Sequence, residues 1–231
     1  MTGLAGKVVI ITGASGGLGR SVTQAFLESE ATVAGVSMSV DTSITHPRFV
    51  SEAVDLADWE ATRALVDKFA GRFGRIDVLA HLTGGFAGGA SVADTEDGVW
   101  ERMLTMNLRT AVHAIRAVLP HMRKAGWGRI LAIGSLAALE PSAGTGAYSA
   151  SKAALVSLVR TIAKENKDAG VTANAVLPGA MDTPANRVAM PKSDPAKWIP
   201  TERIAELLVW LASDAAASIT GAAIPVYGAD V

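Results

Sequence analysis

The sequence predicts an α/β fold: a single doubly wound, Rossmann-type domain spanning residues 1–231. Short apolar runs rich in Val, Ile and Ala alternate along the chain with longer segments of helical periodicity. The runs are apolar throughout, which is typical of strands covered on both faces. Strands that alternate with helices form right-handed βαβ crossovers, so we expect a parallel sheet of about seven strands with helices on both faces.

The elements follow one another at regular intervals. The apolar runs predict strands at 7–12, 32–36, 50–54, 76–82, 129–133, 171–177 and 222–226. Apolar side chains every three or four residues predict helices at 17–28, 59–73, 97–124, 147–166 and 201–212, and the length of the third is compatible with a bend. The proline-rich segment 178–200 has neither pattern, so we expect an irregular, flexible flap over a site there.

The composition excludes several classes of function. With 21 basic and 22 acidic residues the net charge is close to zero, which argues against binding to nucleic acid. The chain has no cysteine, and its four histidines lack metal-ligand spacing, so we expect no metal site. The N-terminus lacks the features of a signal peptide, and no apolar window is long enough to span a membrane. We expect a soluble, cytoplasmic protein.

A glycine-rich turn, TGASGGLG at residues 12–19, joins the first predicted strand to the first predicted helix. Gly13 permits a tight turn, Gly17 lets the backbone approach a pyrophosphate, and Gly19 lets helix and strand pack closely. The free N–H groups at the start of the helix favour phosphate binding. This context predicts a dinucleotide-binding site, the alternative being a glycine-rich surface turn.

Tyr148 and Lys152 are four residues apart on a predicted helix, so their side chains share one face. A free tyrosine has a pKa near ~10, and a nearby ammonium group favours the phenolate and lowers that value. Such a pair could exchange a proton with an alcohol or a carbonyl group. The spacing alone is common by chance, so a surface tyrosine beside a surface lysine is the alternative.

Taken together, these motifs resemble the short-chain dehydrogenase/reductase (SDR) family over nearly the whole chain. The turn has the family's TGxxxGxG form, and Ser135 lies thirteen residues before Tyr148. The resemblance implies that Ser135 binds the substrate oxygen and that Tyr148 is the acid or base. It also implies that Lys152 holds the nicotinamide ribose, and that Asn107 holds a water linking Lys152 to solvent.

The resemblance further implies which residues contact the cofactor. Asp55 matches the family position beside adenine, and Thr183 matches a contact to the nicotinamide carboxamide. The expected set is Gly13, Ser15, Gly16, Gly17, Leu18, Gly19, Ser37, Met38, Asp55, Leu56, Thr83, Gly84, Gly85, Tyr148, Lys152, Pro178, Gly179, Met181 and Thr183.

The choice between NAD and NADP depends on the end of the second strand. An acidic residue there would bind the adenosine ribose and favour NAD, whereas a base would favour the extra phosphate of NADP. This chain has Ser37, Met38 and Ser39, and Gly16 stands where NADP-preferring relatives often carry a base. Because no acid repels a 2′-phosphate and small hydroxyls could donate to it, we favour NADP(H), with NAD(H) as the alternative.

The chain departs from the family where Asn-Asn-Ala-Gly usually follows the fourth strand. Residues 81–84 read His-Leu-Thr-Gly. We expect His81 to replace a structural asparagine by hydrogen bonding, a catalytic histidine being the alternative.

Two segments resemble dihydropteridine reductases more closely: GGFAGG at 84–89, and residues 177–187 with the flap that follows. Those enzymes lack the serine that this chain has at Ser135, which suits a carbonyl or alcohol substrate. The expected walls of the substrate pocket are Phe86, Leu136, Glu140, Met181, Met190 and Trp198. For the Met and Trp residues core packing is the alternative, and for Glu140 a solvated loop charge.

The sequence therefore predicts an NAD(P)H-dependent oxidoreductase that interconverts a small-molecule carbonyl and an alcohol. Reduction of a quinonoid pterin is the runner-up. A dinucleotide-binding sensor without turnover is the alternative from another class, and the complete set of four catalytic residues argues against it. By analogy with the family, the segments 97–124 and 147–166 would build a homotetramer or dimer.

Overall fold

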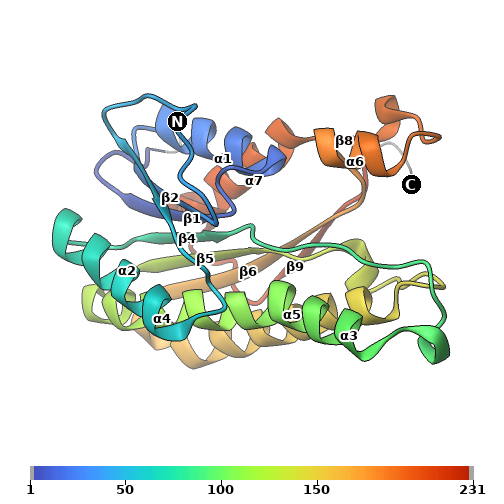
Figure 1. Ribbon diagram of the computed structural model, residues 1–231. Coiled ribbons are helices and arrows are strands. Elements are labelled where there is room, and N and C mark those ends of the chain that lie inside the picture. Colours follow the sequence, from blue (N-terminus) through green and yellow to red (C-terminus); the bar gives the residue numbers. More distant parts are fainter. Residues whose placement is uncertain (1–2, 229–231) are drawn as a thin grey trace.

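The centre of the molecule is a seven-stranded parallel sheet (Figure 1). The structure is a computed structural model that describes residues 3–228. The sheet order is β3-β2-β1-β4-β5-β6-β9. The strands are β1 (Val8–Thr12), β2 (Thr32–Ser37), β3 (Phe49–Ala53), β4 (Val78–His81), β5 (Gly128–Ile133), β6 (Val171–Pro178) and β9 (Ala223–Val226). The predicted doubly wound α/β fold is confirmed.

Helices cover both faces of the sheet. In Figure 1, α1 (Gly17–Glu28) and α7 (Thr201–Ala212) lie above it, and α2 (Trp59–Phe73), α4 (Thr110–Ala125) and α5 (Gly146–Asn166) lie below it. Each layer buries its own apolar core, around Phe26 above and Phe69 below. All residues of β1 and β6 are buried, because helices pack on both of their faces.

Three helices begin and end where the sequence predicts: α1, α2 and α7. The ends of α2 show why. The carboxylate of Asp58 accepts a hydrogen bond from the Ala61 N–H at the start, and Gly74 takes a left-handed conformation at the end. Strand ends differ from the predictions by one or two residues, which is the usual uncertainty at element termini.

The predicted helix at 97–124 is interrupted. It consists of α3 (Asp97–Leu104), a π-helical turn (Thr105–Arg109) and α4. A π turn inserts an extra residue, shifts the side chains around the helix axis and is frequent at functional sites. Asn107 lies inside this turn and is buried.

The segment 178–200 is less irregular than predicted, and its role as a flap over a site stays a prediction. This segment contains β7 (Met181–Asp182) and β8 (Ile199–Pro200), which pair in parallel, and the short helix α6 (Pro184–Ala189). Thr183 caps α6 through its hydroxyl, and Pro184 fits the first turn because it needs no N–H partner there. Figure 1 shows α6 and β8 on the same side of the sheet as α1 and α7.

Short 3₁₀ turns complete the chain at Val92–Asp94, Leu136–Ala138, Lys167–Ala169, Pro195–Lys197 and Asp214–Ala216. Within residues 3–228, no helix combines the length and the apolar character that crossing a bilayer requires.

The carboxyl ends of β1 and β4 are neighbours, although the chain continues from β1 to one side of the sheet and from β4 to the other. Ligands of such sheets bind outside this switch point.

Candidate active site

The glycine turn leaves β1 at the switch point and passes close to the chain that follows β4. Gly13 has a φ of 71°, and a Cβ atom there would lie 3.1 Å from the Thr83 nitrogen. A Cβ atom on Gly19 would collide with the Gly13 carbonyl oxygen. Side chains are therefore excluded at both positions, and backbone alone is present between β1 and the N-terminus of α1 at these points. We call residues 12–19 the cradle, because N–H groups at a helix N-terminus after such a turn are a typical phosphate-binding feature.

The segment 178–200 approaches the cradle at Thr183 and Pro184. A Cβ atom on Gly17 would lie 3.0 Å from the Cβ atom of Thr183. Thr183 is buried, and its hydroxyl accepts a hydrogen bond from the Asn186 N–H at the start of α6. The predicted nicotinamide contact thus stands beside the predicted phosphate site.

The end of β2 carries small polar groups. The Ser37 hydroxyl accepts a hydrogen bond of 3.1 Å from the Ser15 N–H, which ties β2 to the cradle. Met38 is 75% exposed.

Sequence reasoning missed Asp41, which follows β2 and whose carboxylate lies 3.6 Å from the side chain of Arg20 in α1. Hydrogen bonds from Ser43 are the main reason that the pKa of Asp41 lies below its ordinary value.

Asp55 and Leu56, the predicted contacts to adenine, are both engaged in contacts within the protein. The Asp55 carboxylate accepts a hydrogen bond from the Ala57 N–H and so shapes the turn before α2. Leu56 is buried in the lower core, and its carbonyl oxygen lies 2.9 Å from Nδ1 of His113. Leu18 is buried in the upper core as well. The side chains of Leu18 and Leu56 therefore pack in the protein, and only their backbone is left to meet a cofactor.

Asn107 links the loop after β4 to α5. Its Oδ1 accepts a hydrogen bond from the Gly85 N–H (2.9 Å), and its Nδ2 donates to the Gly85 carbonyl (3.0 Å). Nδ2 also donates to the Ser151 hydroxyl, which in turn donates to the Tyr148 carbonyl. Sequence reasoning missed Ser151, although its place three residues after Tyr148 puts it on the same helix face.

Lys152 is fully enclosed. Its ammonium donates a hydrogen bond of 2.8 Å to the carbonyl oxygen of Ile133, the last residue of β5. Burial lowers the pKa of Lys152 to about 8, because desolvation disfavours the charged form. A Cβ atom on Gly84 would lie 2.7 Å from Oδ1 of Asn107 and 3.0 Å from Nζ of Lys152. These three residues therefore converge on one point.

Tyr148 is directed towards Ser135. Burial raises the pKa of Tyr148 above its ordinary value, and a hydrogen bond with the Ser135 side chain offsets part of that increase. The expected lowering of this pKa by Lys152 is not found, because burial dominates and the ammonium is engaged with Ile133 instead. The phenol is therefore in its protonated form at neutral pH.

His81 ties the two halves of the site together. It is completely buried, with Nδ1 2.9 Å from the Thr12 hydroxyl and Nε2 3.5 Å from the Thr110 hydroxyl. Burial, with a smaller effect of Lys152, lowers the pKa of His81 to about 3. The ring is neutral at physiological pH and bridges the cradle to α4, which fits the structural interpretation.

The predicted substrate walls are in different environments. The ring of Phe86 stands 5.0 Å from that of Tyr148, edge to face. Leu136 lies 3.3 Å from the position of a Cβ atom on Gly179. Glu140 is exposed and accepts a hydrogen bond of 2.7 Å from the Tyr227 hydroxyl, a partner that sequence reasoning missed. Met181 and Met190 are partly buried.

Trp198, the last of the predicted substrate walls, is buried. Only 6% of its surface is exposed, and it belongs to the buried apolar side chains of the protein. Its position follows from the flap, where the Trp198 N–H donates to the Pro195 carbonyl and the next residue joins β8. Burial fits core packing and the wall of an enclosed pocket equally, so the place of Trp198 in the substrate pocket stays a prediction.

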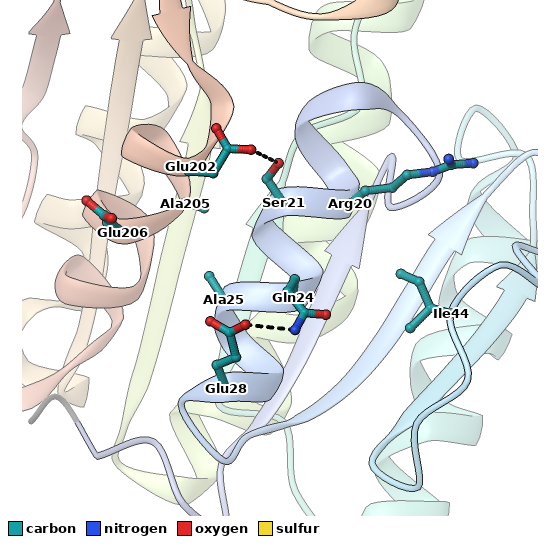
Figure 2. Close-up of a pocket in the computed structure, with 9 residues that line it drawn as sticks. All are labelled: Arg20, Ser21, Gln24, Ala25, Glu28, Ile44, Glu202, Ala205 and Glu206. Carbon is teal, nitrogen blue, oxygen red and sulfur yellow. Dashed lines mark hydrogen bonds between the residues drawn. The ribbon is translucent and has the colours of Figure 1, made fainter.

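A groove of about 510 Å³ lies away from this constellation, on the outer surface between α1 and α7 (Figure 2). Its lining residues are Arg20, Ser21, Gln24, Ala25, Glu28, Ile44, Glu202, Ala205 and Glu206. Figure 2 shows Ser21 bonded to Glu202 across the two helices and Gln24 bonded to Glu28 within α1. None of the predicted catalytic or cofactor-binding residues lines this groove, so it is separate from the candidate active site.

Known proteins resemble this chain in sequence and in fold. The family model described as short chain dehydrogenase matches residues 7–194. A D-β-hydroxybutyrate dehydrogenase of Rhizobium meliloti is 30% identical, over 96% of this chain and 97% of its own length. A 3-oxoacyl-(acyl-carrier-protein) reductase of Thermotoga maritima is 29% identical, over 97% and 98%. The ligand-free aldohexose dehydrogenase of Thermoplasma acidophilum superposes with a TM-score of 0.90 at 27% identity, over 98% of this chain and 94% of that chain.

Proposed function

The chain belongs to the short-chain dehydrogenase/reductase family, and from that premise we propose that it interconverts a carbonyl compound and an alcohol with a nicotinamide dinucleotide as the hydride carrier. The observation that carries the proposal is the position of Tyr148 on α5, one turn before the buried Lys152 and linked through Ser151 to Asn107. The Ser135 side chain lies near enough to Tyr148 to lower the pKa of the phenol, so we infer that a protonated phenol and a second hydroxyl stand side by side near a buried ammonium. Two convergent hydroxyls suit the oxygen of a carbonyl group.

Each side chain has a role in the reductive direction. Ser135 and Tyr148 donate hydrogen bonds to the carbonyl oxygen, and Tyr148 transfers its proton to that oxygen as negative charge develops. The raised pKa of Tyr148 keeps this proton in place until it is needed. Lys152 and Asn107 stand behind Tyr148 and favour return of a proton to the phenolate, through a water at Asn107.

The bound dinucleotide supplies the hydride. The cradle residues would hold its phosphates, Thr183 and Gly179 would border the nicotinamide, and Lys152 would hold the ribose. We propose a preference for NADP(H), because Ser37 and Met38 carry no negative charge at the end of β2 and Ser37 offers a hydroxyl. NAD(H) is the alternative.

The names of the relatives support this chemistry. A hydroxybutyrate dehydrogenase, an oxoacyl reductase and an aldohexose dehydrogenase all act, by name, on hydroxy or oxo groups. Pterin reduction, the runner-up from the sequence, is not favoured by these names. For the oligomer, Leu104 is 40% exposed and helps to line a groove on α3 and α4, which suits the homo-oligomer expected from the family.

The test is cofactor oxidation with a panel of ketones and aldehydes, measured side by side with NADPH and NADH and with a quinonoid dihydropterin as a further substrate. Turnover of carbonyl compounds, faster with NADPH, is the expected result. Activity confined to the pterin would overturn the proposal. Binding of NADPH, seen by its fluorescence, without oxidation by any substrate would identify a dinucleotide sensor instead.

A further inference from the structure

Phe86 is an exposed aromatic side chain in contact with the catalytic phenol. Its side chain is 67% exposed, while its ring centroid lies 5.0 Å from that of Tyr148 at an interplanar angle of 72°. A single exposed apolar residue is ordinary on a protein surface. Its position is the informative feature, because an aromatic ring beside a proton donor can contact whatever substituent the reacting group carries.

Close backbone contacts position the loop that carries Phe86. Glycine pairs flank Phe86 on both sides, at 84–85 and 88–89. A Cβ atom on Gly85 would lie 2.6 Å from Cε of Met106, and one on Gly88 would lie 2.8 Å from the Gly144 carbonyl oxygen. The Gly89 N–H also donates to that carbonyl, at 2.9 Å. The loop is thus packed against the π turn and against the segment before α5, which fixes the place from which the Phe86 side chain starts.

Apolar side chains from the next two loops are exposed at the same edge of the sheet. Leu139, after β5, is 47% exposed, and Val188 of α6, after β6, is 82% exposed. Because β4, β5 and β6 are parallel neighbours, the loops that follow them leave the same edge of the sheet. We call Phe86, Leu139 and Val188 the mouth of the site.

Two charged side chains in these loops, Glu140 and Arg187, have hydrogen-bond partners within the protein. Glu140 accepts a hydrogen bond from Tyr227. Arg187 donates two hydrogen bonds to Asp182, of 2.6 and 2.8 Å. An ionic substituent on the substrate would have to compete with these pairs, whereas an apolar ring would meet the apolar mouth directly.

We propose that the substrate carries an aromatic ring on its carbonyl carbon and that Phe86 determines this specificity by contacting that ring. The inference rests on the proposed function, because Tyr148 is taken as the donor to the carbonyl oxygen. With the oxygen at Tyr148, a ring on the adjacent carbon lies within reach of the Phe86 ring. Aromatic pairs prefer such edge-to-face or offset contacts.

The test compares two ketones of similar size, acetophenone and cyclohexyl methyl ketone, in the wild type and in Phe86→Ala. We expect the substitution to lower kcat/KM for acetophenone about tenfold and for the saturated ketone about threefold or less, since an aromatic pair adds to the effect of apolar area alone. Phe86→Trp, which keeps an aromatic ring, should retain the preference for acetophenone. Val92→Ala, which removes an equally exposed side chain (67%) from the same loop, should change neither value.

A binding measurement makes the result independent of turnover. Line broadening of the ¹⁹F signal of 4′-fluoroacetophenone should report binding to the wild type in the presence of NADP⁺, and it should be lost in Phe86→Ala. Equal losses for both ketones, or unchanged binding in Phe86→Ala, would overturn the inference while leaving the proposed function intact. If the wild type reduces no carbonyl compound, the proposed function fails, and the ¹⁹F measurement alone decides whether Phe86 binds an aryl ring.

Discussion

The cradle and the mouth lie at the same edge of the sheet but are built in different ways. The cradle is one continuous segment in which glycines let backbone approach backbone, as Gly13 and Gly19 show. The mouth takes single side chains from three loops that are distant in sequence. A continuous backbone surface suits a group that is the same in every dinucleotide cofactor, such as the pyrophosphate. Separate loops, in contrast, can be substituted one at a time without altering the others. The comparison suggests that cofactor binding and substrate choice can be altered independently.

The largest effect is expected for Tyr148→Phe, which should lower the turnover rate without changing the affinity for the cofactor. Tyr148→Phe removes the proton donor but leaves the cradle untouched, so we expect kcat to fall by a factor of about 10³. NADPH binding, measured by fluorescence, should stay close to the wild-type value. Tyr227, the only other tyrosine, supplies a matched control, and Tyr227→Phe should change kcat little. Near-normal turnover in Tyr148→Phe would refute the assignment of the donor.

The substitution Gly84→Ala tests the point between the cradle and the mouth at which Asn107 and Lys152 come together. The added Cβ atom would lie 2.7 Å from Oδ1 of Asn107 and 3.0 Å from Nζ of Lys152, so both must move. We expect a loss of about 10²-fold in kcat, the usual cost of displacing a catalytic group by about 1 Å. Gly98→Ala in α3 is the control, because nothing lies within 4 Å of its Cβ position. If Gly84→Ala retains full activity, the convergence of these groups has no catalytic value.

The substitution His81→Asn tests whether the buried bridge from Thr12 through His81 to Thr110 makes the free energy of unfolding depend on pH. The pKa of His81 is about 3 in the folded chain against an ordinary value of 6.5. Between these values the unfolded chain binds one proton more, so stability is complete above pH 6.5 and falls by about 1.4 kcal/mol per pH unit below it. Urea unfolding from pH 7 to pH 4 should show this slope in the wild type and lack it in His81→Asn. His121→Asn is the surface control, and a slope that persists in His81→Asn would contradict the prediction.

The smallest expected effect concerns cofactor choice. Ser37→Asp introduces a negative charge at the end of β2, next to the Ser15 N–H. We expect the ratio of kcat/KM for NADPH over NADH to fall about tenfold, because the carboxylate repels a 2′-phosphate and binds ribose hydroxyls. The preference between the two ketones should not change, since the mouth is not involved. A shift in ketone preference would show that cradle and mouth are coupled.

Local patterns account for what could be predicted from the sequence. The ends of α1, α2 and α7 follow from helical periodicity and capping residues, which act over a few positions. The cradle and the Tyr148–Lys152 pair follow from short-range spacing. The prediction of one helix at 97–124 missed a π turn, and the prediction of irregular structure at 178–200 missed the β7–β8 pairing, because neither feature follows from a local periodic pattern.

The sequence by itself determined the fold class, the cradle and the identity of the residues that could carry chemistry, because backbone geometry and side-chain periodicity are local properties. Only the tertiary structure decided what those residues touch. It directs Lys152 to the carbonyl of Ile133, places Ser151 between Asn107 and Tyr148, and sets Phe86 against the phenol. These outcomes depend on burial and on carbonyl groups contributed by distant strands. Burial also reversed the expected shift of the Tyr148 pKa, since desolvation depends on everything packed around a group and not on its neighbours in sequence.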